Sequence, residues 1–398
     1  MTIKHCPDDF QVEEILKPEF LAQRSEQDAF ALYRLRKQGL ATPEAIGRIA
    51  RQLGVKSGAL AYGGLKDKHA STIQQITLKL EKKENAPDKA SGPGWELERL
   101  GFVSRSLTAS DIHRNRFRIV LRNLSVEQCS KMDEAVKFFS LAGQLRIVNY
   151  FGEQRFGSAR HHQGFIAKYL IRGDFEGALK LAIATESRKD RMEQKVFKRA
   201  LLKHWGQWRE VLPKLRRCPE RKAIERLVNS SKDFRAAFCA LPYLLQQLSV
   251  YAYQSYLWNE TARRLIEKTC APREKMLEVN SAYGRLLFPA VDAIPPELIA
   301  LKIPLLARKT QLTGVWAEAT EETLKAEAIH LAELQIPGVR RPFFGEELRA
   351  FFFNTEEFQI SALELDETAK NKTRRKRVIA FTLAPGCYAT VLLRALGE

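Results

Sequence analysis

The stretch Ala61–Gln75 (AYGGLKDKHASTIQQ) places two glycines and a dense group of charges between two apolar runs. Residues 59–62 form the first run, and in the second Ile76, Leu78 and Leu80 alternate with polar residues at the period of a β-strand. Glycine has no Cβ, so the pair lets the backbone turn tightly and approach a ligand closely. The sequence therefore predicts two strands joined by a charged loop, a position that often carries functional side chains.

One carboxylate in this loop, Asp67, stands among three potential cations, Lys66, Lys68 and His69. Neighbouring positive charge stabilises an ionised carboxylate and lowers its pKa. An ionised Asp67 suits a nucleophile or a general base better than a proton donor. The alternative interpretation is an exposed, solvated charged turn.

The charge of the chain indicates its kind of partner. The chain has 398 residues, enough for two domains or for one domain with a large insertion. Its 65 Lys and Arg residues exceed its 47 Asp and Glu residues by 18. Such an excess of positive charge favours a polyanionic partner, nucleic acid before an anionic membrane.

Nothing in the sequence predicts a membrane or secreted protein. No segment approaches ~18 consecutive apolar residues, and the first ten residues, MTIKHCPDDF, lack the apolar core of a signal peptide. The six cysteines are scattered without a C-x-x-C pair, which favours reduced thiols over a disulfide framework or a zinc site. We therefore expect a cytoplasmic protein.

Two further runs combine strand patterns with polar or aromatic side chains. Lys4 precedes a strand-like run that contains Phe10, and taken alone these are a tail charge and a core residue. In the run HRNRFRIVLRN (113–123), Asn115 and Phe117 are two residues apart, so in a strand both side chains leave the same face. An amide and a ring on one face can hydrogen-bond a base edge and stack on its plane. The alternative is a turn residue beside a core residue.

The run NYFGEQRFG (149–157) contains three rings, two glycines, two amides and an arginine. This combination fits a surface that approaches sugar-phosphate or a splayed base. The glycines near both ends also fit a hinge. We therefore predict a pocket-wall and hinge role for this run, without a catalytic step for any of its residues.

These runs together resemble the TruD family of tRNA pseudouridine synthases. Five motifs carry the resemblance, in the family's own order: Lys4 six residues before Phe10, G-x-K-D-K-x-A at 64–70, N-x-F at 115–117, N-Y-F-G-x-Q-R-F-G at 149–157, and G-x-[YF]-A-T at 386–390. The match spans both ends of the chain and its middle, and the segment after residue 157 matches weakly.

The resemblance implies an isomerase that converts a uridine of tRNA, uridine 13, to pseudouridine. The sequence shows no P-loop, dinucleotide fingerprint or metal cluster, so we expect no cofactor and no metal. The resemblance further implies that Asp67 is the catalytic carboxylate, that Lys4 pairs with Asp67, and that Phe10 helps line the uracil pocket. It associates Asn115 and Phe117 with uracil binding. The other predicted substrate-binding residues are Lys66, Asn149, Phe151 and Arg155.

The resemblance also implies the fold and the partners. We expect an α+β protein whose pseudouridine-synthase-like catalytic domain is built on a mixed, largely antiparallel sheet flanked by helices. A mostly helical, family-specific insertion domain is expected at 158–339, between catalytic parts at 1–157 and 340–398. The expected partner is RNA, most of all tRNA, and we expect a monomer that uses no small-molecule cofactor.

Several local patterns predict secondary structure. Thr42, a good N-cap, and the proline after it predict a helix that ends at Gly54 and packs beneath the charged loop. Ser125 and Gln128 predict a capping box for a helix that ends near Gly143. Residues 81–94 are polar and rich in glycine and proline, which predicts an exposed loop. The aromatic residues between 343 and 353 are predicted to be core, and His161 and His162 to be surface residues.

Two basic segments are predicted to contact RNA phosphates. Residues 188–235 contain 16 Lys or Arg against 6 Asp or Glu, with Trp205 and Trp208 among them, which is typical of an RNA-backbone surface. Residues 370–377 (KNKTRRKR) hold six cations between two strand-like runs. They predict a charged hairpin, with a localisation signal as the alternative. Affinity from such contacts falls steeply with salt.

The chemistry of Asp67 stays open at this point. Its carboxylate would attack C6 of the base or C1′ of the ribose, or help to deprotonate C2′. Two rival classes of protein remain: a catalytically silent RNA-binding or chaperone protein, and an RNA hydrolase or nuclease that uses Asp67 as a base. An isomerase conserves the mass of the RNA, whereas a hydrolase releases fragments or free uracil.

Overall fold

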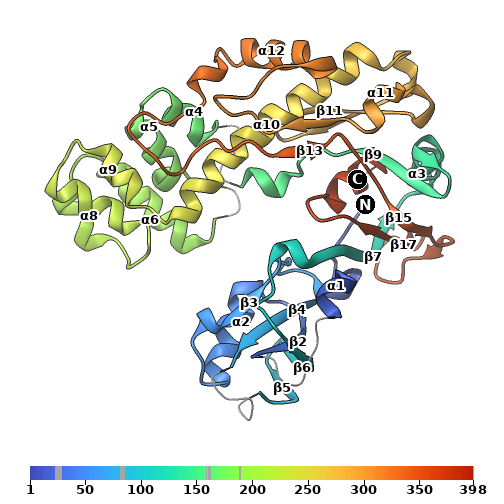
Figure 1. Ribbon diagram of the computed structural model, residues 1–398, viewed down its shortest axis with the longest axis horizontal. Coiled ribbons are helices and arrows are strands. Elements are labelled where there is room, and N and C mark those ends of the chain that lie inside the picture. The colour runs from blue at the N-terminus through green and yellow to red at the C-terminus, as the bar shows by residue number, and fades with distance from the viewer. Residues whose placement is uncertain (23–28, 81–85, 158, 160–162, 188–189, 398) are drawn as a thin grey trace. The chain divides into compact units, whose positions relative to one another are not determined.

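The structure, a computed structural model, describes the chain except residues 23–28, 81–85, 158, 160–162, 188–189 and 398 (Figure 1). The chain folds into two compact units. The first unit contains residues Met1–Ile147 and Phe353–Glu398, and the second contains Val148–Phe352. Along the chain, the second unit is therefore inserted into the first.

The described part of the first unit is built on one ten-stranded sheet, in the order β15-β17-β7-β1-β4-β2-β6-β5, with β3 paired to β4 and β16 to β17. The strands of this sheet are β1 (Phe10–Leu16), β2 (Phe30–Lys37), β3 (Leu60–Tyr62), β4 (Ser71–Lys79), β5 (Lys89–Gly92), β6 (Trp95–Val103), β7 (Ile112–Leu124), β15 (Glu356–Ile360), β16 (Glu364–Leu365) and β17 (Arg375–Leu383). β1 and β4 run parallel, whereas the other described pairs of this sheet are antiparallel. This confirms the predicted mixed, largely antiparallel sheet.

Helices and a small sheet complete the first unit. The helices are α1 (Pro18–Leu21), α2 (Thr42–Gln52), α3 (Val126–Phe139) and α13 (Ala389–Ala395). The three short strands are β8 (Ser140–Leu141), β9 (Gln144–Val148) and β14 (Phe352–Asn354), in the order β14-β9-β8. The predicted capping box of α3 is present, because Ser125 accepts from the backbone N–H of Gln128 and the Gln128 side chain accepts from the backbone N–H of Ser125.

Helix α2 covers the face of the sheet formed by β2, β4 and β6. Its buried residues Ala45, Ile46 and Ile49 lie on one side of the helix and pack against apolar side chains such as Leu35 and Ile76. Each fully buried large aliphatic side chain contributes about 1.5–3 kcal/mol relative to an exposed one. This packing fixes α2 beneath the loop that follows β3.

Three local predictions need correction. Thr42 is the first residue of α2 and not its N-cap, which is Ala41. Residues 86–94 contain strand β5 and the buried residue Ala86, where an exposed loop was predicted, because β5 pairs with β6 and completes the sheet. Phe343 is 52% exposed, whereas Phe344 and the rings at 351–353 are buried as predicted. Residues 81–85, His161 and His162 lie outside the described residues.

The second unit is mostly helical. Its helices are α4 (Ile166–Ile171), α5 (Phe175–Leu179), α6 (Met192–Lys203), α7 (Trp208–Val211), α8 (Arg221–Asn229), α9 (Phe234–Cys239), α10 (Tyr243–Thr269), α11 (Pro296–Ile299) and α12 (Ala317–Ala326). Its strands form the hairpin β10 (Met276–Ser281) with β11 (Gly284–Pro289), and the pair β12 (Lys302–Pro304) with β13 (Leu348–Ala350). Figure 1 shows α4–α9 grouped at one end of the long helix α10, and α12 beside it. In the described residues, no helix combines the length and apolar character needed to cross a bilayer.

Gly63, at the end of β3, is required by close packing. A Cβ at this position would lie 2.8 Å from the side chain of Ile112 and 3.1 Å from the carbonyl oxygen of Thr108. We expect Gly63→Ala to lower the free energy of unfolding by about 1 kcal/mol or more. Urea unfolding measures this change.

Gly47, inside α2, provides the matched control, because nothing lies within 4 Å of a Cβ built there. Gly47→Ala should raise the free energy of unfolding by about 0.5–1 kcal/mol, since alanine is the better helix former. If both substitutions shifted stability in the same direction, close packing at Gly63 would not be the explanation.

Candidate functional site

Asp67 lies in the loop between β3 and β4, as predicted, and its side chain is 24% exposed. Lys4, from the N-terminal segment, donates a hydrogen bond to Asp67 Oδ2 and forms an ion pair with it. The backbone N–H of His69 donates to Oδ1 at 2.9 Å. Both carboxylate oxygens therefore have donors, and the side chain is held in one orientation while part of it remains open to solvent.

The surroundings keep Asp67 ionised. Burial raises its pKa. The hydrogen bonds from Lys4 and from the backbone of His69, together with the charge of Lys4, lower the pKa by more than burial raises it. The net pKa lies below the usual value of 3.8. At neutral pH the carboxylate is therefore available as a nucleophile or a base, and not as an acid.

Three side chains that the sequence did not predict to belong to this site hold the backbone of the loop. Thr42 Oγ1 accepts from the backbone N–H of Lys66 at 3.0 Å and donates to Gln74 Oε1 at 2.8 Å. Gln74 Nε2 donates to the carbonyl oxygen of Gly64 at 3.3 Å. Thr42 therefore supports the loop through its hydroxyl group, and the N-cap position of α2 is taken by Ala41.

Lys37 is the third of these side chains, and it is 2% exposed. Its ammonium donates to the carbonyl oxygens of Leu40 at 2.8 Å, Asp67 at 3.0 Å and Lys66 at 3.3 Å. Burial lowers the pKa of Lys37 from 10.5 to about 8, against the opposing effect of the Asp67 charge. Lys37 thus ties the backbone of the catalytic candidate to the turn before α2.

Aromatic rings lie next to the Lys4–Asp67 pair. The Lys4 ammonium is 4.3 Å from the centre of the Phe10 ring. Phe117 meets Phe10 edge to face at 6.2 Å and stacks on Phe381 at 5.2 Å with an angle of 23° between the rings. The strand register explains this group, because Phe117 is opposite both Val12 of β1 and Phe381 of β17. The predicted residues Lys4, Phe10, Asp67 and Phe117 therefore come together in the first unit.

Lys66 and Asn115 are joined on the same face of the sheet. The Lys66 ammonium lies 2.6 Å from Glu14 Oε2 and donates to Asn115 Oδ1 at 2.9 Å. Asn115 is opposite Glu14 in the β1–β7 register, so both side chains leave the same face. The Lys66 side chain is 8% exposed, so this predicted substrate-binding residue is turned inward beneath Asn115.

The remaining predicted site residues lie in the second unit. Asn149 and Phe151 are buried, and Arg349 donates to Asn149 Oδ1 at 2.6 Å and lies over the Phe151 ring at 3.9 Å. Asn259 of α10 forms two hydrogen bonds with the backbone of Phe151. Arg155 donates to Ser255 Oγ at 3.2 Å. These contacts are internal to the second unit, and contact of the three residues with substrate stays a prediction.

The two predicted basic segments present exposed cations, but the tryptophans of the first segment do not lie on an open surface. Trp208 is buried, and Trp205 packs against it at 5.0 Å and donates to Glu176, so these rings form part of a helical core and not an open surface. The exposed cations of this segment for which no acid partner occurs in the described residues are Arg191, Lys203, Arg209, Lys214, Arg217, Lys222, Arg226, Lys232 and Arg235. Residues 370–377 lie in the hairpin of β16 and β17, as predicted.

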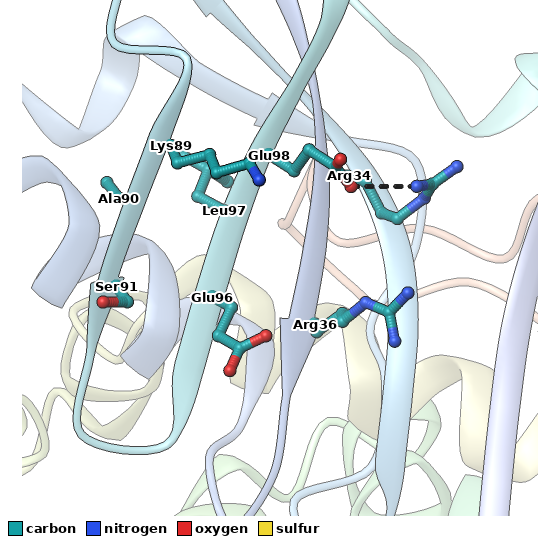
Figure 2. Close-up of a pocket in the computed structure, with 8 residues that line it drawn as sticks. All are labelled: Arg34, Arg36, Lys89, Ala90, Ser91, Glu96, Leu97 and Glu98. Atoms are coloured by element: carbon teal, nitrogen blue, oxygen red, sulfur yellow. Dashed lines mark hydrogen bonds and ion pairs between the residues drawn. The ribbon is translucent and has the colours of Figure 1, made fainter.

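A separate concavity of about 410 Å³ lies on β2, β5 and β6 (Figure 2). Arg34 pairs there with Glu98 at 2.9 Å, and Arg36 also lines it. Side chains alternate along a strand, so Arg36 leaves β2 on the face opposite to Lys37. None of the predicted site residues lines this concavity, and it is not part of the group around Asp67.

Comparison with known proteins identifies the family. The sequence model of the family described as tRNA pseudouridine synthase D (TruD) matches residues 1–396. The chain belongs to this family. An Aquifex aeolicus protein named tRNA pseudouridine synthase D is 31% identical over 406 residues, which cover 99% of this chain and 97% of the relative. A Methanocaldococcus jannaschii protein named Probable tRNA pseudouridine synthase D 2 is 30% identical over 405 residues, which cover 99% of this chain and 91% of the relative.

A solved structure supports the fold of this family member. The crystal structure of a Methanosarcina mazei protein described as "Putative tRNA pseudouridine synthase D (TruD)" has a TM-score of 0.69. It is 24% identical to this chain, and the match covers 99% of this chain and 92% of that one. The predicted α+β fold and the membership in a family of pseudouridine synthases, which are isomerases, are confirmed.

The pKa of Lys37 leads to a test by pH. Between about pH 8 and pH 10.5 the folded protein has released the Lys37 proton, whereas the unfolded chain still binds it. The unfolded state binds more protons in this window, so the free energy of unfolding rises with pH because of Lys37. The contribution is unfavourable below pH 8 and is relieved above it.

We expect the wild-type free energy of unfolding, measured in urea, to rise relative to that of Lys37→Met across this window. The limiting slope of the difference is about 1.4 kcal/mol per pH unit. The variant is the control for every other group that titrates in the same range. Parallel curves for the two proteins would mean that Lys37 titrates normally and that its buried position is wrong.

Proposed function

We propose that this protein converts a uridine of tRNA, uridine 13, to pseudouridine, and that Asp67 is the catalytic carboxylate. The observation that carries the proposal is the Lys4–Asp67 ion pair beside Phe10. It joins an ionised, partly exposed carboxylate to the rings of Phe10 and Phe117. The family of the chain and the names of its relatives support the same reaction.

The reaction rearranges bonds and conserves every atom. The N1–C1′ bond of the uridine breaks, the uracil turns, and a bond forms between C5 and C1′. The proton of C5 is lost, and N1 gains a proton, so no oxidant or energy source is needed. Asp67 would attack C6 or C1′, or would help to remove the proton of C2′ on a route through a glycal. All three roles require the ionised form that its environment favours.

The neighbours of Asp67 have separate tasks in this proposal. Lys4 orients the carboxylate and holds it ionised. Phe10 and Phe117 line the space for a uracil that has left its stack and must stay captured while it turns. Asn115 addresses the edge of the base. The released uracil is therefore held by contacts that do not depend on its bond to the ribose.

The rest of the chain would bind the RNA backbone. We propose that the family-specific insertion domain is the segment 158–339 and that the exposed cations of its helices, with those of hairpin 370–377, contact phosphates. Asn149, Phe151 and Arg155, which belong to the run 149–157, are also proposed to bind the substrate. Acting on tRNA, the protein would work in the cytoplasm, as a monomer and without a small-molecule cofactor.

The proposal predicts which substitution removes activity. We expect wild-type protein to form pseudouridine in unmodified tRNA transcripts and Asp67→Asn to form none, a loss of at least about 10³-fold, because an amide is neither a nucleophile nor a base here. The measurement is pseudouridine content after single-turnover incubation, with both proteins at concentrations that bind all of the RNA. Arg116→Gln, on the opposite face of β7, is the control.

The possible outcomes separate the rival proteins. Conversion of uridine by both the wild type and Asp67→Asn would mean that Asp67 is not the catalytic carboxylate. RNA binding without conversion by the wild type would favour the silent RNA-binding protein. Cleaved strands or free uracil would favour a hydrolase.

A further inference from the structure

The ammonium of Lys66 is held between two acceptors beneath the proposed uracil pocket. It lies 2.6 Å from Glu14 Oε2 and 2.9 Å from Asn115 Oδ1. The side chain of Glu14 has no exposed surface, and its other oxygen accepts from the backbone N–H of Gln75 at 3.4 Å. The chain of contacts therefore runs from β4 through Glu14 and Lys66 to Asn115.

The chemistry of an ammonium determines how the Asn115 amide is turned. A lysine ammonium donates hydrogen bonds and accepts none, so the Asn115 atom that faces Lys66 must be the carbonyl oxygen. The NH₂ group then points away from Lys66. No described residue accepts a hydrogen bond from this NH₂ group. Asn115 is only partly buried, so the donor is open to a ligand.

Glu14 prevents Lys66 from leaving this position. A fully buried carboxylate that loses its cation is strongly destabilised, because its charge is then neither solvated nor paired. Lys66 cannot turn to solvent or to the RNA without leaving Glu14 in that state. The orientation of the Asn115 amide is thus set by a buried ion pair and not by the substrate.

We propose that Lys66 and Glu14 determine the base specificity of the site by fixing Asn115 as a hydrogen-bond donor to O4 of the target base. Uracil carries a carbonyl acceptor at this position, whereas cytosine carries an amino donor. With cytosine two donors would meet, and both would lose their bonds to water without a replacement. Lys66 and Glu14 are positioning residues here, and Asn115 makes the contact.

This inference rests on the proposed function. Its test measures the preference of the protein for uridine over cytidine in binding, which is a separate quantity from the rate of conversion. Dissociation constants are measured for two tRNA transcripts that differ only in U or C at position 13. Phosphate contacts are the same in both, so the ratio of the two constants isolates the base. We expect the wild type to bind the U transcript about tenfold more tightly, the effect of one unmatched polar group.

Asn115→Asp is the decisive variant. Its carboxylate still accepts from Lys66, and it presents a second acceptor where the NH₂ group stood. We expect the ratio of the two dissociation constants to fall to one, or the preference to reverse in favour of cytidine. The added negative charge weakens the binding of both transcripts equally, so its effect cancels in the ratio of the two dissociation constants. Arg116→Gln, the next residue of β7 and on the opposite face, is the matched control and should keep the wild-type ratio.

A second variant tests the positioning role. Lys66→Met combined with Glu14→Gln removes both charges together, so no buried charge is left unpaired. The Asn115 amide is then free to turn, and we expect the preference for uridine to drop to less than about threefold. Thermal unfolding of each variant checks that it is folded, and if Asn115→Asp fails to fold, this double variant decides the question.

The outcomes distinguish the two proposals. If the wild type converts uridine 13 and both variants keep its preference for U, the specificity inference is overturned and the proposed function stands. If the wild type converts no uridine but prefers the U transcript, and Asn115→Asp reverses this, the amide reads the base and the proposed function fails.

Discussion

The ion pair between Lys4 and Asp67 joins two segments that are 63 residues apart. Other contacts fix both segments in the positions that the ion pair requires. Lys4 has a φ of 61°, in the left-handed region that costs a non-glycine residue about 1 kcal/mol or more. The segment on either side is tied to Arg122 of β7. Thr2 forms two backbone hydrogen bonds with Arg122. The Nε of Arg122 also donates to both carboxylate oxygens of Asp9, at 3.0 Å each. The strained residue is thus fixed from both sides, as expected where geometry matters more than local stability.

Lysines support the same loop in three chemically different ways. Lys4 meets a partly exposed carboxylate and keeps it ionised. Lys66 neutralises a buried carboxylate and turns an amide. Lys37 meets backbone carbonyl oxygens, and burial lowers its pKa to about 8. A positive charge close to Asp67 is therefore only part of their effect, because each lysine also fixes the position of a different group.

The sequence predicted the elements that depend on local pattern. Alternation identified β1, β4 and β7, and the spacing of Asn115 and Phe117 placed both on one face, as the register with β1 confirms. The capping residues of α3 were read correctly from four positions. The charged loop was assigned to the right place between β3 and β4, because glycine and clustered charge interrupt a strand pattern whatever the rest of the chain does.

Long-range contacts could not be read in this way. Lys37 ends a strand and looks like any surface cation, and only its distance to the carbonyl oxygens of Lys66 and Asp67 shows its role. Thr42 was taken as a cap because its type and position fit one, whereas its hydroxyl bonds Gln74 instead. The glycine pair was expected to supply a turn, but Gly63 is needed for its close approach to Ile112. In each case the deciding partner is distant in sequence.

The most direct test of this account is the pH dependence of single-turnover conversion by Lys4→Met. In the wild type, the donors around Asp67 outweigh burial and hold its pKa below 3.8, so the rate should stay level as the pH falls towards 4. Without Lys4, burial raises the pKa of Asp67, and the rate should fall at a distinctly higher pH than in the wild type. An acid limb at the same pH in both proteins would contradict the claim that Lys4 keeps the catalytic carboxylate ionised.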